Sequence, residues 1–256
     1  MRGAGAEIGD NAALRTHRSF AKRRMPKVFA IVPAAGQGTR IGDPVPKQYI
    51  PLAGKPMVFH SLAALSKVSR IERIFVVLAP ADRHWARHDW SALAARVEPL
   101  YEGGSHRPQS VLNALHALDG RVAPDDWILV HDAARPCIAT ELVEQFLDEL
   151  DDDPVGGLLA MPLADTLKSA AEGQRVAATI PRLNLWRAQT PQMFRYDLLR
   201  RGLERRPDAT DESQAVESLD KQPRLVEGEN GNLKVTFAED LALAEMILAV
   251  QGTRRA

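Results

Sequence analysis

The sequence predicts an α/β protein built on a doubly wound, mostly parallel sheet with helices on both faces. Short apolar runs alternate with helix-like stretches over roughly the first 160 residues, as expected for consecutive βαβ units. Polar motifs follow directly after the apolar runs, and such sheets bind their ligands beyond the carboxyl ends of the strands. With 256 residues, of which 45% are hydrophobic, the chain suits one large domain.

The individual elements are predicted from β-branched runs and from apolar periodicity. Strands are expected at Val28–Val32, Ile74–Leu78, Trp127–Val130, Val155–Met161 and near Lys234–Phe237. Helices are expected at Pro56–Leu65, Arg107–Leu118, Glu141–Leu150, Tyr196–Glu204, from Asp211, and after a capping-box pattern that begins at Thr236. Thr140 is the expected N-cap of the third of these helices.

Two segments differ from the rest in composition. Residues 1–26 are rich in Arg and poor in acids and lack an apolar signal region. We predict a disordered basic tail there; an organelle transit peptide, or a true start at Met25, are the alternatives. Residues 165–192 contain few apolar runs and are predicted to form an arm that protrudes from the single domain, 27–251, and serves dimerisation.

Composition excludes several classes of function. Lys and Arg together number 33, as do Asp and Glu, so the overall charge favours neither nucleic acid nor a membrane surface as a partner. The single cysteine, Cys137, rules out an internal disulfide and a multi-cysteine zinc site. One thiol suits the reducing cytoplasm, and no apolar run approaches the roughly 18 residues of a membrane helix.

A glycine-rich segment follows the first predicted strand and indicates a phosphate-binding turn, because glycine lets backbone N–H groups approach phosphate oxygens. No Walker A string is present. Gly36, Gly38 and Gly42 miss the dinucleotide-binding spacing by one place, and no Asp or Glu lies between Pro44 and Ile71 to hold a ribose. A dehydrogenase-type cofactor site is therefore disfavoured.

The same segment fits a nucleotidyltransferase signature. The chain reads Ala-Ala-Gly-Gln-Gly-Thr-Arg from Ala34 to Arg40, and Pro-Lys-Gln-Tyr from Pro46 to Tyr49. Arg40 and Lys47 place two cations beside a backbone cradle, which suits the roughly four negative charges of a nucleoside triphosphate.

With these motifs the sequence resembles the 2-C-methyl-D-erythritol 4-phosphate cytidylyltransferase family of the non-mevalonate isoprenoid pathway. Matching segments cover 28 to about 250, and beyond the glycine-rich turn they include 103–111, 131–136, 165–168, 182–192, 210–212 and 232–236. The resemblance implies a Rossmann-like nucleotidyltransferase fold, Mg²⁺ as cofactor, and a homodimer in which each arm reaches over the neighbouring site.

The implied reaction joins a polyol phosphate to the α-phosphorus of CTP and expels pyrophosphate. The attacking phosphate is largely dianionic at neutral pH, because its second pKa is about 6. No general base is then needed, and His131 is given no acid–base role. Two anions must meet while charge builds on the α-phosphoryl group, so cations and a metal ion are expected.

The resemblance assigns the site residues to three overlapping groups. The expected catalytic residues are Arg40, Lys47, Arg182 and Lys234. The expected nucleotide-binding residues are Ala34, Ala35, Gly36, Gly38, Arg40, Lys47, Gly103, Gly104, Arg107, Ser110, Asp132 and Ala133. The expected acceptor-binding residues are Asp132, Arg135, Thr166, Arg182, Thr190 and Lys234. Asp132 is also the expected Mg²⁺ ligand.

Two other functions remain open at this point. A cytidylyltransferase for another polyol phosphate, such as ribitol 5-phosphate, would have the same glycine-rich segment and a different arm. A non-catalytic nucleotide-binding module is expected to lack Arg40, Lys47 or Asp132, and all three are present.

Overall fold

The structure is a computed structural model that describes residues 24–36 and 45–253. Its central sheet contains β1 (Val28–Pro33), β4 (Ile71–Val77), β5 (Val97–Leu100), β6 (Trp127–Val130), β7 (Gly156–Pro162), β10 (Trp186–Arg195) and β11 (Arg224–Glu227). The order across the sheet is β11-β7-β10-β6-β1-β4-β5. β10 runs antiparallel to β6 and β7, and the other neighbouring pairs are parallel. The predicted mostly parallel α/β fold is confirmed.

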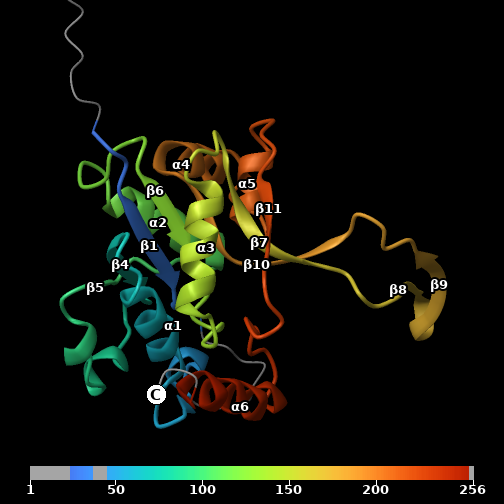
Figure 1. Cartoon of the computed structure of the whole chain (residues 1–256), viewed down its shortest axis with the longest axis horizontal. Helices are drawn as coiled ribbons and strands as arrows, with labels where there is room; N and C mark the ends of the chain where they lie inside the picture. Colours follow the sequence, from blue (N-terminus) through green and yellow to red (C-terminus); the bar gives the residue numbers. More distant parts are fainter. Residues whose placement is uncertain (1–23, 37–44, 254–256) are drawn as a thin grey trace, which may run out of the picture.

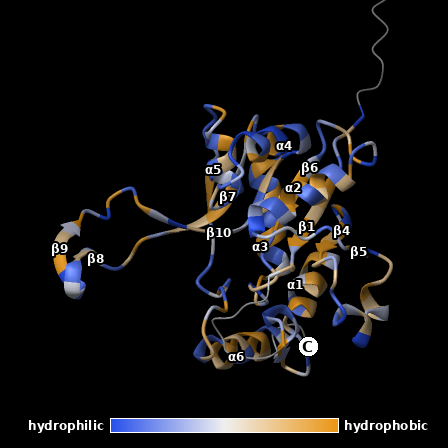
Figure 2. Ribbon diagram, turned by 180° about the vertical axis from the view of Figure 1, so that it is seen from behind, coloured by the Kyte–Doolittle hydropathy of each residue, from blue (hydrophilic) through white to orange (hydrophobic). Residues whose placement is uncertain are grey.

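Helices cover both faces of this sheet (Figure 1). One face packs against α1 (Met57–Ser66) and α3 (Thr140–Leu150), and the other against α2 (Arg107–Ala117), α4 (Tyr196–Arg205) and α5 (Glu212–Glu217). The result is a three-layer sandwich, and Figure 2 shows the hydrophobic residues concentrated in its middle layer.

The strand period of two explains how one sheet serves two cores. In β1, Ala30 and Val32 pack with α1 and α3, whereas Phe29 and Ile31 pack with α2 and α4. All four are buried. A parallel strand that is covered on both faces must be apolar at every position, which is why these strands could be predicted from short continuous apolar runs.

Several short elements lie between the longer strands and helices. They are the hairpin of β2 (Pro51–Leu52) and β3 (Lys55–Pro56) and the 3-10 helices η2 (Lys47–Tyr49), η3 (Trp85–Arg87) and η4 (Ser91–Leu93). The last helix, α6 (Glu239–Thr253), buries Ala244 against Leu52, Met57 and Cys137. This small third core attaches the C-terminal helix beside α1.

A two-stranded arm stands away from the body (Figure 1). It consists of β8 (Leu167–Ala171), the 3-10 turn η5 (Glu172–Gln174) and β9 (Arg175–Ile180), which pair only with each other among the described strands. β10 begins at Trp186 opposite Pro162 of β7. The segment 165–192 therefore divides into a protruding hairpin and the first residues of a strand of the central sheet.

Several local expectations were wrong. The last helix is capped by Asp240, whose carboxylate accepts from the N–H groups of Thr236 and Phe237 at 2.7 and 2.8 Å, and not by Glu239. Thr140 is the first residue of α3, preceded by Ala139 at the cap position, and its hydroxyl donates to the Ala64 carbonyl.

Several strand assignments also differ from expectation, and the largest difference is β10, a strand between β6 and β7 that was not predicted and whose first residues were assigned to the arm. Residues 234–237 form no strand, and they meet the motif after β6 through a backbone bond from Val235 N–H to the Ala134 carbonyl at 2.8 Å and through the side chain of Lys234. β5 and β11 were not predicted, because both are four-residue edge strands with exposed or half-buried positions. Edge strands of this kind give no continuous apolar run.

No helix in the described part of the chain is long and apolar enough to span a bilayer.

Arg24 lies just before β1 in the sequence. Its guanidinium forms an ion pair with the buried carboxylate of Asp126 at 2.5 Å.

The junction of β7 and β10 supplies a stability prediction. Gly156 has a φ of +106°, and a Cβ added there would lie 2.1 Å from the Met193 carbonyl oxygen. Gly156→Ala is expected to destabilise the protein by about 1–3 kcal/mol, through backbone strain and overpacking. Urea unfolding measures the change. Gly252→Ala, where an added Cβ meets nothing within 4 Å, is the matched control, and equal stability of the two variants would contradict this account.

Candidate active site

A cavity of about 630 Å³ opens at the carboxyl ends of β1, β4 and β6. It is lined by Pro33, Ala35, Gly36, Lys47, Gln48, Ala79, Pro80, Gly103, Gly104, Ser105, His106, Arg107, Ser110, Asp132, Ala133, Ala134 and Lys234. The motifs after the three strands, far apart in the sequence, therefore meet where the parallel sheet predicts.

One wall of the cavity is formed by closely packed backbone. A Cβ on Gly103 would lie 2.3 Å from the Ala35 Cβ, and Gly103 N–H donates to the Leu78 carbonyl at 2.8 Å. Gly104 N–H donates to the Ser110 hydroxyl at 3.0 Å. Glycine is required where backbone segments approach this closely, and the wall presents small residues and backbone polar groups to a ligand.

Lys47 reaches the cavity from a short ordered turn. Within η2, Gln48 and Tyr49 are buried, the Gln48 amide donates to the Ala34 carbonyl at 2.7 Å, and the Tyr49 hydroxyl donates to Asp82 at 2.9 Å. These bonds attach the turn to the loops after β1 and β4, so that the neighbouring lysine faces the same cavity.

Asp132 is the carboxylate at which the cations of the site converge. Its Oδ1 accepts from Arg107 Nε at 2.8 Å, and its Oδ2 lies 2.9 Å from Lys234 Nζ and 3.8 Å from Arg135 Nε. Burial alone would raise the pKa of Asp132, but the charges of Arg107 and Lys234 outweigh burial and hold the pKa well below its usual range. The carboxylate is therefore ionised throughout the neutral range.

Arg107 links Asp132 to a second buried acid, Glu212, which has no predicted role in the site. Its NH1 and NH2 atoms donate to the two oxygens of Glu212 at 2.7 and 3.0 Å, from residues 105 positions apart. Burial disfavours the charge of Arg107, but Glu212 and Asp132 together raise its pKa. The guanidinium is thus a permanent cation held between two carboxylates.

A smaller cavity of about 170 Å³ adjoins the first and shares Arg107, Asp132 and Lys234 with it. Arg135 and Thr190 line its far side. NH1 of Arg135 donates to the Asn232 carbonyl at 2.8 Å, whereas its buried Nε has no hydrogen-bond partner among the described residues. The smaller cavity therefore offers cationic donors to an anionic group.

His131 orders the loop that carries Asp132 and Arg135. Asp132 N–H donates to the Thr190 hydroxyl oxygen at 3.0 Å. The Thr190 hydroxyl in turn donates to His131 Nδ1 at 3.2 Å. The other ring nitrogen, Nε2, then donates to the Arg135 carbonyl at 3.2 Å. This arrangement requires a neutral imidazole, and burial lowers the pKa of His131 to about 4. His131 is therefore hydrogen-bonded locally, to Thr190 and to the Arg135 carbonyl.

The donors at Asp132 fit a magnesium ion bound together with a nucleotide. The described residues contain no cluster of three or more His, Cys, Asp or Glu side chains that could hold a metal unaided. Mg²⁺ usually takes one or two protein carboxylates and completes its shell with water and substrate phosphates. The Asp132 carboxylate has the chemistry of such a ligand, and the side chain of Lys234, which contacts Oδ2, is 49% exposed.

The structure brings most of the predicted site residues together around the two cavities. Ala34 is buried and lines neither cavity. Thr166 and Arg182 are exposed on the arm. Arg182 lines a separate hollow with Leu163 and Leu185, and these residues contribute to neither cavity. Two further predicted residues, Gly38 and Arg40, lie outside the described residues.

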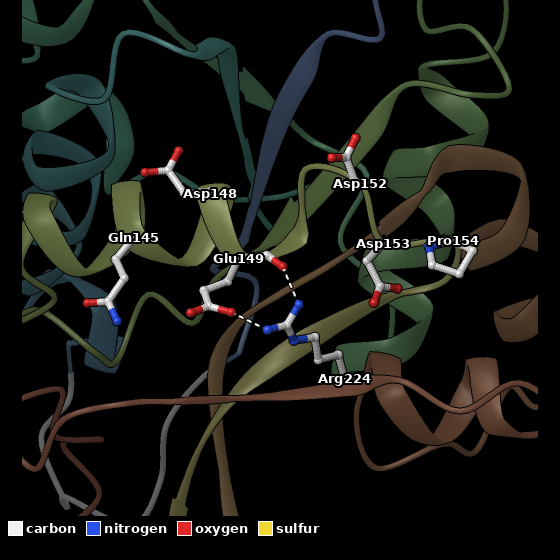
Figure 3. Close-up of a pocket in the computed structure, with 7 residues that line it drawn as sticks. All are labelled: Gln145, Asp148, Glu149, Asp152, Asp153, Pro154 and Arg224. Atoms are coloured by element: carbon white, nitrogen blue, oxygen red, sulfur yellow. Dashed lines mark hydrogen bonds and ion pairs between the residues drawn. The ribbon is translucent and has the colours of Figure 1, made fainter.

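A second surface hollow lies between α3 and β11 (Figure 3). Three of its four acidic side chains have structural partners: Arg224 binds both the carboxylate and the carbonyl of Glu149, and Asp153 accepts from two backbone N–H groups. Asp148 pairs with Arg70. The contacts of Arg224 attach the edge strand β11 to α3, and we assign no catalytic role to this hollow.

A mostly parallel sheet with a glycine-walled cavity and several cations around one ionised carboxylate is the arrangement expected of a nucleotidyltransferase. Comparison with known proteins gives the family, because the profile of 2-C-methyl-D-erythritol 4-phosphate cytidylyltransferase matches residues 28–250. The chain belongs to this family.

Individual relatives agree with that assignment. The chain is 54% identical to the cytidylyltransferase of Aromatoleum aromaticum over 89% of its own length and 98% of the relative, and 55% identical to that of Dechloromonas aromatica over 88% and 98%. A crystal structure of 4-diphosphocytidyl-2C-methyl-D-erythritol synthase superposes with a TM-score of 0.78 at 35% identity, covering 87% of this chain and 99% of that one. The Francisella tularensis enzyme gives 0.72 at 31%, with 86% and 99% covered.

The buried His131 predicts a pH dependence of stability. Between its folded pKa of about 4 and the ordinary value of about 6.5, the unfolded chain binds a proton that the folded protein does not. The free energy of unfolding should therefore fall as the pH drops through this window, by roughly 1.4 kcal/mol per pH unit from this group.

The variant His131→Gln should lose that part of the slope. Urea unfolding of both proteins at about pH 5 and pH 6.5 measures it, and above about pH 7.5, where the imidazole is neutral in both states, the two curves should run parallel. Identical slopes for the two proteins in the acidic window would show that His131 is not held neutral by burial.

Proposed function

We propose that the chain transfers the CMP group of CTP to 2-C-methyl-D-erythritol 4-phosphate, giving 4-diphosphocytidyl-2-C-methyl-D-erythritol and pyrophosphate. Membership of the family supports the choice of donor and acceptor. The observation that carries the chemistry is the pair of adjoining cavities that share Arg107, Asp132 and Lys234. The larger cavity suits the nucleotide, and the smaller one suits the acceptor phosphate.

The residues of the site act mainly by holding charge. Lys47 faces the larger cavity, where it neutralises the triphosphate, and Arg40 belongs to the same glycine-rich motif. Lys234 and Arg135 hold the acceptor phosphate in line with the α-phosphorus. A dianionic phosphate needs no base, so positioning and electrostatic stabilisation account for the catalysis.

The cofactor that we propose is Mg²⁺, bound by Asp132 together with phosphate oxygens of CTP. When bound, the ion supplies positive charge to the α-phosphoryl group and to the leaving pyrophosphate. Lys234 is then released from Asp132 Oδ2 and becomes available to the acceptor phosphate. Its half-exposed side chain makes that exchange possible without a change in the backbone.

The arm supports a homodimer in which each hairpin completes the neighbouring site. Val176, Ile180, Leu183, Leu185 and Trp186 on the arm are exposed large hydrophobic residues, and in Figure 2 β9 is coloured as strongly hydrophobic although it lies far from the core. An apolar hairpin that stands in solvent gains stability by packing against a second copy. Thr166 and Arg182 would then reach the partner's acceptor cavity.

We place the enzyme in the cytoplasm. Cys137, the single cysteine of the sequence, is a buried free thiol, and burial raises its pKa to about 12. A chain that has one protonated, buried thiol and no disulfide suits a reducing compartment.

The function is tested by following pyrophosphate release from CTP in the presence of Mg²⁺ and 2-C-methyl-D-erythritol 4-phosphate. Ribitol 5-phosphate as acceptor, and ATP, GTP and UTP as donors, serve as parallel reactions. Release should require CTP and the methylerythritol phosphate. Release with ribitol 5-phosphate alone would instead identify a cytidylyltransferase for another polyol phosphate.

Lys47 supplies a prediction for the donor side. Lys47→Ala should lower turnover about 10²–10³-fold, by analogy with the loss of one donor to a developing oxyanion, without changing the thermal midpoint. Lys67→Ala, on the exposed end of α1, is the matched control. Near-normal turnover in the Lys47 variant would refute the role given to this residue.

The arm can be tested by subunit complementation. Arg182→Ala and Lys47→Ala proteins should each be nearly inactive alone. If each arm serves the neighbouring site, a mixed dimer has one intact site, and random mixing should restore about a quarter of the wild-type rate. Mixtures that stay inactive, although mass spectrometry shows mixed dimers, would mean that Arg182 acts within its own subunit.

A further inference from the structure

Glu212 is a buried carboxylate to which the proposed mechanism gives no role. It is the first residue of α5, its side chain is 1% exposed, and it carries its charge inside the protein. Its ion-pair partner in the described part of the chain is Arg107. Asp132 and Asp211 add negative charge nearby, and burial together with these acids raises the pKa of Glu212 despite the arginine.

The contact between Glu212 and Arg107 fixes the plane of the guanidinium. NH1 and NH2 each donate to one oxygen of Glu212, at 2.7 and 3.0 Å, which is the two-point geometry of a carboxylate with the end of an arginine fork. In this orientation the third nitrogen, Nε, donates to Asp132 Oδ1 at 2.8 Å. Glu212 therefore determines where Arg107 meets Asp132.

Helix stability does not explain this arrangement. Arg107 is the first residue of α2, and the first turn of that helix contains no acid. A cation at a helix N-terminus is unfavourable, because the backbone dipole is positive there. A buried ion pair is also weak support for a fold, since an apolar pair of similar size often serves as well. What the arrangement does provide is an arginine held in place beside the cavity.

Charge balance gives Glu212 its second effect. In the cluster, Arg107, Arg135 and Lys234 face Asp132 and Glu212. Because Arg107 is shared between two carboxylates, it neutralises Asp132 less completely. Asp132 therefore attracts an incoming cation more strongly. Without the charge of Glu212, Arg107 would be paired with Asp132 alone, and the cavity would be one unit more positive.

We propose that Glu212 is a positioning residue of the transfer reaction, which acts through Arg107 to orient Asp132 and to preserve its charge toward a divalent cation. The proposal rests on the proposed function, in which Asp132 binds the metal with CTP. It assigns Glu212 no contact with substrate. Partners of this kind behind a metal ligand typically change metal affinity by about 10–100-fold when they are removed.

The test measures Mn²⁺ binding to the CTP complex by electron paramagnetic resonance, without acceptor, so that no turnover occurs. Glu212→Gln keeps the shape of the side chain and removes its charge, and it should weaken Mn²⁺ binding about tenfold or more. CTP binding in EDTA should be unchanged or tighter, because the cavity gains net positive charge. Glu217→Gln, at the exposed end of the same helix, should match wild type in both measurements.

The outcomes separate this inference from the function on which it rests. Mn²⁺ affinity in Glu212→Gln equal to wild type, with or without a lower thermal midpoint, would reduce Glu212 to a structural role and leave the function standing. Absence of Mn²⁺ binding in the wild-type CTP complex would overturn the metal role of Asp132 and this inference together.

A second variant covers the case in which Glu212→Gln does not fold. Glu212→Asp keeps the charge but shortens the side chain by one methylene, so that Arg107 is held less well. Its Mn²⁺ affinity should be lower than that of wild type, by less than the tenfold or more expected for loss of the charge. An affinity equal to wild type would contradict the positioning role.

Discussion

One ionised carboxylate surrounded by cations is the interaction on which the site depends. Asp132 lies within 4 Å of Arg107, Arg135 and Lys234, and these charges keep it ionised although it is almost fully buried. The same cations are the groups that a triphosphate and an acceptor phosphate require. The Asp132 carboxylate thus balances cations that substrate phosphates would also neutralise. These cations can exchange Asp132 for the phosphates when the substrates bind.

The topology of the sheet explains how these charges come together. Asp132 follows β6, the glycine-rich segment follows β1, and the two strands are parallel neighbours. Arg107 opens the helix that packs behind them, whereas Thr190 lies on the antiparallel strand β10 beside β6. Asp132 and Arg107 lie at the ends of rigid elements, so this part of the cavity needs little reorganisation to hold charge in place.

The fold and the centre of the site could be predicted, because both depend on short continuous segments of the sequence. Continuous apolar runs mark strands covered on both faces, and the motifs after them contain Lys47 and Asp132. What could not be predicted depends on distant contacts. Glu212 meets Arg107 across 105 positions, and no local pattern identifies such a partner. β5 and β11 lie at the sheet edges, where most of their residues are half-buried or exposed and need not be apolar. β10 lies inside the sheet, but the polar residues Gln189, Thr190 and Gln192 interrupt its apolar pattern.

The role of Asp132 is the central claim, and the magnesium dependence of pyrophosphate release from Asp132→Asn tests it most directly. The amide has the shape of the carboxylate without its charge. The account predicts that the variant needs a much higher Mg²⁺ concentration and turns over about 10²–10³-fold more slowly at saturating CTP. An unchanged Mg²⁺ dependence with near-normal turnover would contradict it.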